Sequence, residues 1–201
     1  PDYNDNGPLL TGNIGGTGAW TRTGGVGATL YQRRASPTFS GGLTVLRGGV
    51  QWNQTGLATA DAGAYTFGGG AITLNGGGFI WNCTALSGNN GFGMTLANPI
   101  NVGPSGGNLF YGQNGGSGYY PNCIFSGPIA LGGVLNIESS TGKNGSMPLY
   151  NGAVTLSQAG GAAGGFSKTW TLTSNAEGFD PLCVNGVIGD GSGGGAFDVN
   201  F

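Results

Sequence analysis

Residues 39–45 read Phe39-Ser40-Gly41-Gly42-Leu43-Thr44-Val45, and this phrase recurs along the chain. It consists of an aromatic residue, any residue, a glycine, any residue, and two aliphatic residues one position apart. It returns from Phe125 to Leu131 and from Tyr150 to Leu156, and a form stretched by one residue runs from Phe67 to Leu74. Short strands that are joined by glycine turns and return at spacings of roughly 25–30 residues are typical of a β-solenoid. We therefore predict an all-β fold, a single-stranded parallel β-helix.

The residues between these phrases support strands rather than helices. Leu43-Thr44-Val45-Leu46 is followed by a turn at 47–49 and by Val50-Gln51-Trp52, and the same unit returns at 71–81 with a turn at Asn75-Gly76. Alternation of aliphatic residues with Thr, Asn or Gln is what a strand with one buried face requires. No segment carries apolar residues at helical spacing over three turns, and glycine disfavours helices.

The composition allows one stacked core. The chain has 201 residues, of which 38% are hydrophobic, 10% aromatic and only 7% charged, with 47 glycines. We expect residues 1–201 to form a single β-solenoid domain, with an opening repeat at about 9–52 and an unfinished closing repeat at about 184–201. At roughly 25 residues per coil, the chain would make about seven or eight coils.

The two ends of the chain resemble each other. Gly12-Asn13-Ile14-Gly15-Gly16 is similar to Gly186-Val187-Ile188-Gly189-Asp190, and Gly18-Ala19-Trp20 is similar to Gly195-Ala196-Phe197. The terminal coil of an isolated solenoid is usually capped by polar residues, whereas residues 197–201 alternate aromatic and polar residues. We predict that the ends stack head to tail into a filament, through an interface of Leu9, Leu10, Ile14, Trp20, Ile188, Phe197, Val199 and Phe201. The alternative is a fragment of a longer protein whose neighbouring repeats supply the missing coils.

Residues 14–30 together with 39–50 resemble the autotransporter-associated β-strand repeat, with Arg22 in the place usually held by lysine. The resemblance extends over about residues 9–52 and recurs weakly at 98–111 and 186–201. It implies a right-handed parallel β-helix, as in the passengers of bacterial secreted or surface proteins, and so an extracellular or cell-surface location. A second candidate function is an adhesin passenger or glycan-binding module of a larger surface protein, with Tyr111, Tyr119 and Tyr120 as an aromatic platform for sugars.

The residue inventory gives little support for chemistry. The chain has no histidine, which excludes Ser-His-Asp and Cys-His arrangements, and its acids are isolated or loosely paired. We expect a non-enzyme with no cofactor and no metal. Six Lys/Arg against eight Asp/Glu leave no basic stripe for nucleic acid, so the expected partner is the chain itself or a neighbouring repeat. No apolar run is long enough to span a membrane.

Two further features leave alternatives open. Cys83, Cys123 and Cys183 are too far apart for a CxxC site, so they are small core residues, or one intrachain disulfide, or a link to another chain. The sequence begins at Pro1 without a methionine or a signal-like segment, which we interpret as a processed mature chain or as a piece of something longer.

Overall fold

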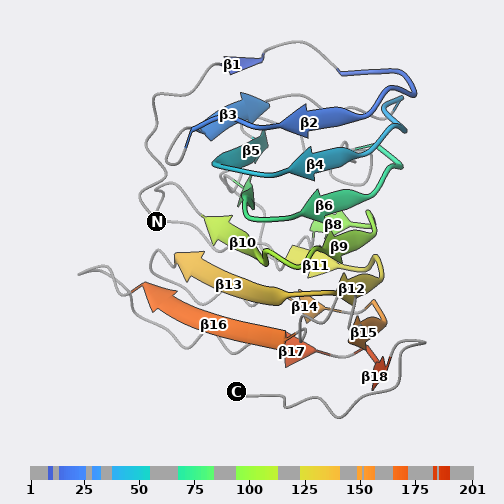
Figure 1. The fold of residues 1–201 in the computed structure, drawn as a ribbon, viewed down its shortest axis with the longest axis vertical. Coiled ribbons are helices and arrows are strands. Elements are labelled where there is room, and N and C mark those ends of the chain that lie inside the picture. Colours follow the sequence, from blue (N-terminus) through green and yellow to red (C-terminus); the bar gives the residue numbers. More distant parts are fainter. Residues whose placement is uncertain are drawn as a thin grey trace, which may run out of the picture.

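The protein is a stack of parallel strands (Figure 1). The structure, a computed structural model, describes residues 9–10, 14–25, 29–32, 38–54, 68–83, 94–112, 123–140, 149–150, 152–156, 165–171, 183–184 and 186–190. Every regular element within these residues is a strand. Each strand pair is parallel, which confirms the predicted all-β parallel solenoid.

The strands form three sheets, which we number 1 to 3. Sheet 1 has seven strands: β1 (Leu9–Leu10), β3 (Thr29–Gln32), β5 (Gly49–Gln54), β7 (Gly78–Cys83), β10 (Gly107–Gly112), β13 (Val134–Ser140) and β16 (Gly165–Thr171). Sheet 2 also has seven: β2 (Trp20–Arg22), β4 (Leu43–Val45), β6 (Ile72–Leu74), β9 (Ile100–Val102), β12 (Ile129–Leu131), β15 (Val154–Leu156) and β18 (Ile188–Asp190). Sheet 3 has four: β8 (Met94–Leu96), β11 (Cys123–Phe125), β14 (Leu149–Tyr150) and β17 (Cys183–Val184).

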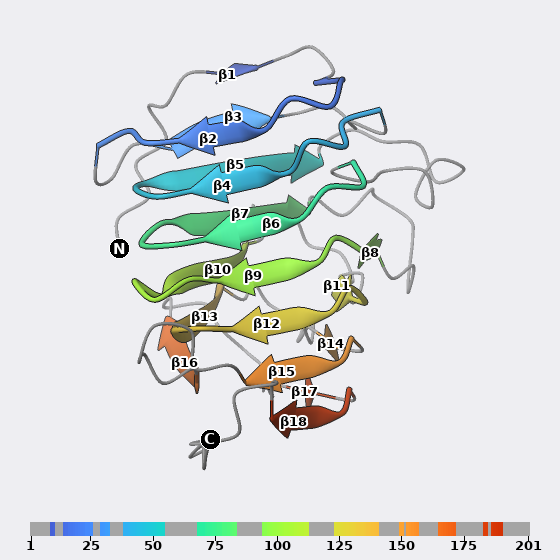
Figure 2. The same ribbon diagram turned by 45° about the vertical axis from the view of Figure 1, so that its right-hand side comes forward.

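Each coil of the chain passes through the sheets in the same order. β8, β9 and β10 follow one another through sheets 3, 2 and 1, and so do β11, β12 and β13 in the next coil (Figure 2). The strand–turn–strand unit of the sequence therefore connects two sheets and is not a hairpin. Gly48, Gly76 and Gly106 make its turn at positive φ values of 65°, 101° and 72°, which residues with a side chain rarely adopt.

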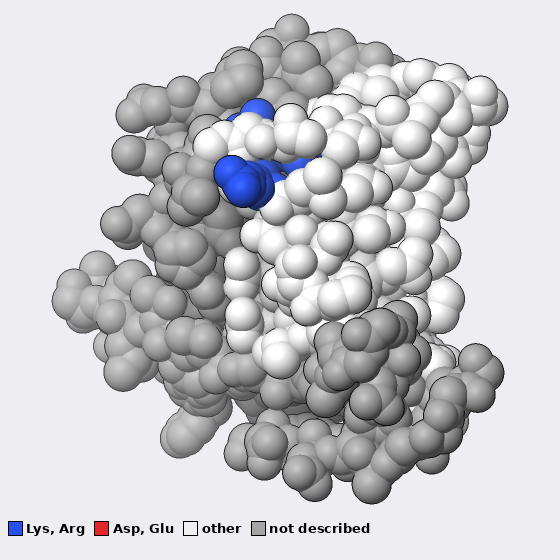
Figure 3. All heavy atoms as spheres, in the orientation of Figure 1, with Lys and Arg blue, Asp and Glu red and all other residues white. Residues whose placement is uncertain are grey.

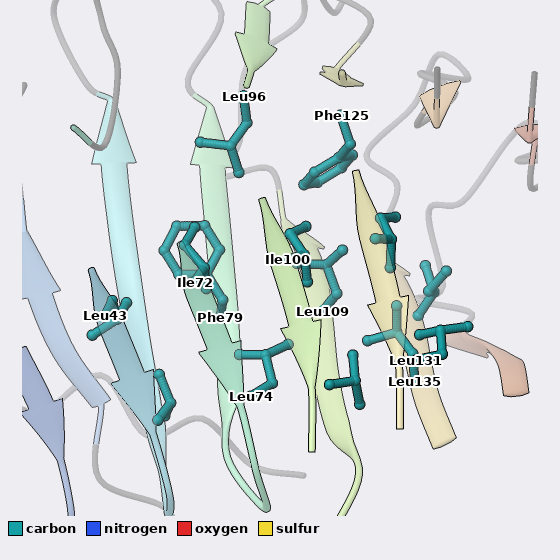
Figure 4. Packing of buried hydrophobic residues seen from close by; sticks show 14 of the residues in the cluster. Leu43, Ile72, Leu74, Phe79, Leu96, Ile100, Leu109, Phe125, Leu131 and Leu135 are labelled. Carbon is teal, nitrogen blue, oxygen red and sulfur yellow. The ribbon is translucent and has the colours of Figure 1, made fainter. Parts of the chain in front are cut away.

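The core is a set of aliphatic and aromatic columns inside the stack. We use "column" for residues that are paired in register through successive strands of one sheet. In sheet 2, Leu43 pairs with Ile72, Ile72 with Ile100, and Ile100 with Ile129, and all of these side chains are buried. Phe79, Leu109 and Leu135 of sheet 1 and Leu96 and Phe125 of sheet 3 fill the space between the sheets (Figure 4).

Coil length is nearly constant in the middle of the stack and varies toward its ends. Side-chain hydrogen bonds between neighbouring coils join residues 28 to 30 positions apart. The coil that joins Trp20 to its partner Leu43 is shorter, and the coil that joins Val154 to Ile188 is longer. The two seven-stranded sheets agree with the predicted seven or eight coils.

The glycine of the recurring phrase lies at the corner before sheet 2, two residues ahead of each strand. A Cβ at Gly41, Gly127, Gly152 or Gly186 would overlap a backbone carbonyl of the preceding coil: that of Gly18, Asn98, Gly127 or Gly152, respectively. Successive coils therefore approach each other by their backbones at this corner, which we call the glycine corner. Close backbone approach is the physical reason for the repeated aromatic-x-Gly phrase.

Asn98 takes the place of glycine in this corner and is buried. Its Nδ2 donates hydrogen bonds to the backbone carbonyls of Gly68 at 3.0 Å and Gly70 at 2.8 Å. The side chain thus ties its coil to the preceding one across the corner.

Candidate functional site

The structure places part of the predicted interface at the first coil of the stack. Leu9 and Leu10 form β1, the outermost strand of sheet 1, where they pair with Tyr31 and Gln32. Trp20 begins β2, the outermost strand of sheet 2 at the same end. Ile14 and Trp20 are half-buried and pack against the core.

The other described interface residue lies at the opposite end (Figure 1). Ile188 begins β18, the last strand of sheet 2, where it is half-buried and packs against the core, as does Val184 of β17. Phe197, Val199 and Phe201 lie outside the described residues. The described members of the predicted interface therefore form two groups, one at each end of the stack.

The register corrects how the two ends correspond. The sequence comparison sets Ile188 opposite Ile14, but Ile188 belongs to the column of Trp20. This column runs through Trp20, Leu43, Ile72, Ile100, Ile129, Val154 and Ile188. The comparison failed because both segments contain a Gly-x-Ile-Gly pattern, whereas register is set by which aliphatic residues reach the core.

The two ends have complementary steps. β1 pairs with β3, which follows β2 in the same coil, so sheet 1 extends one strand beyond sheet 2 at the first end. β18 pairs with β15, which precedes β16 in the same coil, so sheet 2 extends one strand beyond the described part of sheet 1 at the other end. Within the described residues, the strand by which sheet 1 leads at the first end therefore corresponds to the position beside β16 that follows β18 at the other end.

A second column of sheet 2 carries charges at both ends. It runs through Arg22, Val45, Leu74, Val102, Leu131, Leu156 and Asp190. Val45, Leu74, Val102 and Leu131 are buried, so Arg22 and Asp190 occupy the outermost positions of an otherwise aliphatic column. Sequence reasoning missed both residues as site candidates.

Among the residues whose side chains the structure describes, the charged ones are Arg22, which is half-buried, and Arg47, which is exposed. Blue Lys or Arg atoms are the coloured atoms on the face seen in Figure 3. The outward column of sheet 2 consists of small or polar residues: Thr21, Thr44, Thr73, Asn101, Ala130, Thr155 and Gly189. The charged position at each end of sheet 2 is therefore set apart from its surroundings.

The backbone hydrogen bonds of sheet 2 follow one rule from coil to coil. The first residue of each strand donates its N–H to the carbonyl just before the next strand. The series is Trp20 to Gly42 (3.0 Å), Leu43 to Ala71 (2.8 Å), Ile72 to Pro99 (2.8 Å), Ile100 to Pro128 (2.9 Å), Ile129 to Ala153 (2.8 Å) and Val154 to Val187 (2.8 Å). The next donor in the series is the N–H of Ile188.

The cysteines lie on different strands and in no shared column. Cys83 ends β7 in sheet 1, whereas Cys123 and Cys183 begin β11 and β17 in sheet 3. β14 lies between β11 and β17, so the Cα atoms of Cys123 and Cys183 are separated by two strand spacings, about 9–10 Å. A disulfide between these two residues would need a Cα separation below about 7 Å, so this register excludes it.

The described ranges contain no group of three or more His, Cys, Asp or Glu residues that could hold a metal ion. They also contain no helix with the length and apolar character needed to cross a bilayer. Tyr119 and Tyr120 of the expected sugar platform lie outside the described residues, and Tyr111 belongs to β10. What the described residues offer is two sheet ends that can pair with further strands. Comparison with protein-family models, curated proteins and solved structures finds no match for this chain.

Proposed function

We propose that this chain is a structural, non-catalytic β-solenoid that assembles end to end into a fibre on the cell surface or outside the cell. The observation that carries the proposal is the offset of sheets 1 and 2 at the two ends of the described stack, which is complementary from one end to the other. Strand edges attract further strands because their N–H and C=O groups seek partners. A stack whose ends match by shape and direction gives a heterologous contact that does not close, and such contacts produce filaments.

Sheet direction supports the same arrangement. Because every strand pair is parallel, a second copy stacked in the same orientation continues each sheet without reversing it. In this arrangement β2 of the second copy lies next to β18, and its β1 lies next to β16. One contact then extends two sheets at once.

The location rests on the resemblance of residues 14–50 to the autotransporter-associated β-strand repeat. Proteins with that repeat are β-helical passengers of bacterial secreted or surface proteins, so the same setting is proposed for this chain. The low charge and the glycine corner suit a structural role, since both favour tight stacking of coils over exposed reactive groups.

Negative-stain microscopy of the purified chain, combined with light scattering over a range of concentrations, tests the proposal. We expect filaments of constant width above a critical concentration and short rods below it. Monodisperse rods at all concentrations would contradict assembly, and binding of those rods on a glycan array would favour the adhesin function. New reducing ends released from polysaccharides would contradict the non-catalytic role.

Deletion of residues 195–201 tests whether the C-terminal segment contributes to the contact between copies. A higher critical concentration in this variant assigns Phe197, Val199 and Phe201 to the contact. An unchanged critical concentration restricts the contact to residues of β1, β2 and β16–β18.

A further inference from the structure

We infer that Asp190 of one copy forms an ion pair with Arg22 of the next copy, and that this pair sets the register and direction of stacking. The inference rests on the proposed end-to-end assembly and names the contact that specifies it. The partner is a second copy of this chain, whose β2 continues sheet 2 beyond β18.

The hydrogen-bond series of sheet 2 fixes which backbone groups meet. Each strand's first N–H binds the carbonyl just before the next strand, as with Val154 and Val187 at 2.8 Å. Extended by one step, the series directs the N–H of Ile188 to the carbonyl of Ala19 in the second copy. Ala19 is exposed, directly before β2 at the edge of sheet 2.

This backbone register aligns chemically matched residues in each column. Ile188 meets Trp20, which continues the buried aliphatic column of Leu43 and Ile72. Gly189 meets Thr21 on the outer face, where a small residue leaves room for the threonine. Asp190 meets Arg22, so the one column that has a charged residue at each end brings an acid against a base.

The charges favour this pairing over the alternatives. The half-buried Arg22 pairs with the buried Val45, and a joint that covers it would place its charge in more apolar surroundings. A carboxylate of the second copy at the same joint offsets the cost of burying that charge. Two first ends brought together would place two Arg22 side chains and no Asp190 in one joint, and two last ends would place two Asp190 side chains and no Arg22 there. Like charges in one joint repel each other, so the charges favour the head-to-tail contact. Arginine has five N–H donors, so Arg22 can donate hydrogen bonds to a carboxylate of the second copy in addition to its contacts within its own chain.

Charge reversal tests the inference on the full chain. We expect Arg22→Asp and Asp190→Arg each to raise the critical concentration by more than about tenfold, because each variant opposes like charges at the contact. The double variant Arg22→Asp/Asp190→Arg should restore assembly, and so should an equimolar mixture of the two single variants, which can only alternate. Arg47→Asp, a reversal on an exposed turn, is the matched control and should leave assembly unchanged. Circular dichroism and a thermal melt identify any variant that does not fold.

Disulfide trapping tests the register independently. Residues opposite each other on neighbouring strands have Cα atoms about 4.8 Å apart, which suits a disulfide. In a variant with Cys83, Cys123 and Cys183 replaced by alanine, Thr21→Cys/Gly189→Cys should give a ladder of covalent oligomers on a nonreducing gel. A Cβ at Gly189 meets no atom within 4 Å, so the cysteine fits. The control Thr21→Cys/Thr155→Cys, one strand further from the contact, should stay monomeric.

The outcomes separate this inference from the proposed function. Filaments that form in the single charge variants as readily as in the wild type, or a Thr21/Gly189 pair that does not crosslink within filaments, would overturn the inference and leave end-to-end assembly standing. A wild-type chain that never assembles would overturn both. Rescue by the double variant, with the crosslinked ladder, supports the ion pair and its register.

Discussion

At the scale of single residues, the glycine corner shows why this chain contains so many glycines in fixed places. The carbonyl of one coil occupies the space that a Cβ of the next coil would need, as Gly127 shows against Asn98. The requirement comes from contact between backbones of neighbouring coils, so it applies to each coil separately. Glycine at this corner allows the backbones of neighbouring coils to come into contact.

Substitution at the corner should therefore be costly where a similar substitution nearby is not. We expect Gly127→Ala to lower the free energy of unfolding by about 1–3 kcal/mol, because the added methyl group forces the coils apart. Gly69→Ala is the matched control, since Gly69 is exposed and a Cβ there meets nothing within 4 Å. Urea unfolding of both variants checks the difference, and equal stabilities would contradict the close approach.

Asn98 gives a second residue-scale prediction. Asn98→Asp keeps the shape of the side chain but removes the N–H donors that bind the carbonyls of Gly68 and Gly70. We expect a loss of about 1–3 kcal/mol in the free energy of unfolding at neutral pH, because buried acceptors lose their partners. Asn101→Asp, three residues on and exposed, should have little effect. Thermal melts at neutral pH of the two variants make the comparison, and a similar shift in both would count against the corner bonds.

At the scale of elements, the three-residue strands β4, β6, β9 and β12 of sheet 2 have buried first and third residues and a more exposed middle residue. Ile72 and Leu74 of β6 are fully buried, with an exposed fraction of 0%, whereas Thr73 between them is half-buried on the outer face. The pattern holds from β4 to β12, which is why a short phrase is enough to define a strand. Stability in such a stack comes from columns, since each aliphatic side chain packs on its equivalents above and below.

Truncation of β6 measures this column. We expect Leu74→Ala to cost about 2–5 kcal/mol in the free energy of unfolding, because the cavity lies between the fixed side chains of Val45 and Val102. Thr73→Ala in the same strand should change stability by less than about 1 kcal/mol. Chemical denaturation followed by tryptophan fluorescence gives both values. A small effect of Leu74→Ala would show that the column can collapse around the missing group.

Four strands of sheet 2, β4, β6, β12 and β15, could be predicted from sequence because each has two aliphatic residues one position apart after a glycine. The strands of sheet 3 could not all be predicted, since β14 and β17 have two residues each and no period can show in so short a segment. The matched charges of Arg22 and Asp190 were also hidden. Coils of unequal length separate them, so no fixed period brings the two residues into one column. Right-handedness remains a prediction.

At the scale of the whole molecule, the stack has a direction. Within the described residues, sheet 2 begins with the strand that contains Trp20 and Arg22 and ends with the strand that contains Ile188 and Asp190. Opposite charges at opposite ends of one column give each copy a polarity that neighbouring copies can follow. Assembly through such ends is expected to depend on both burial and charge.

Salt separates these two contributions. We expect the critical concentration of the wild type to rise severalfold between ionic strengths of about 0.05 M and 0.5 M, because salt screens the pair at a filament joint. The neutral variant Arg22→Gln/Asp190→Asn should assemble more weakly at low salt and respond little to the change. Light scattering across the salt series provides the measurement. If the critical concentrations of the two proteins changed equally with salt, the ion pair would not contribute to assembly.

Because each coil pairs with the next in the same way, the number of coils sets the length of the molecule. Ile72 and Ile100 hold equivalent places in adjacent coils, so the intervening segment, 72–99, is one interchangeable module. Tandem duplication or loss of such a module would change the length of the particle by one strand spacing, about 4.8 Å, without altering either end. Evolution could thus adjust reach in discrete increments while the surfaces that recognise the next particle stay the same.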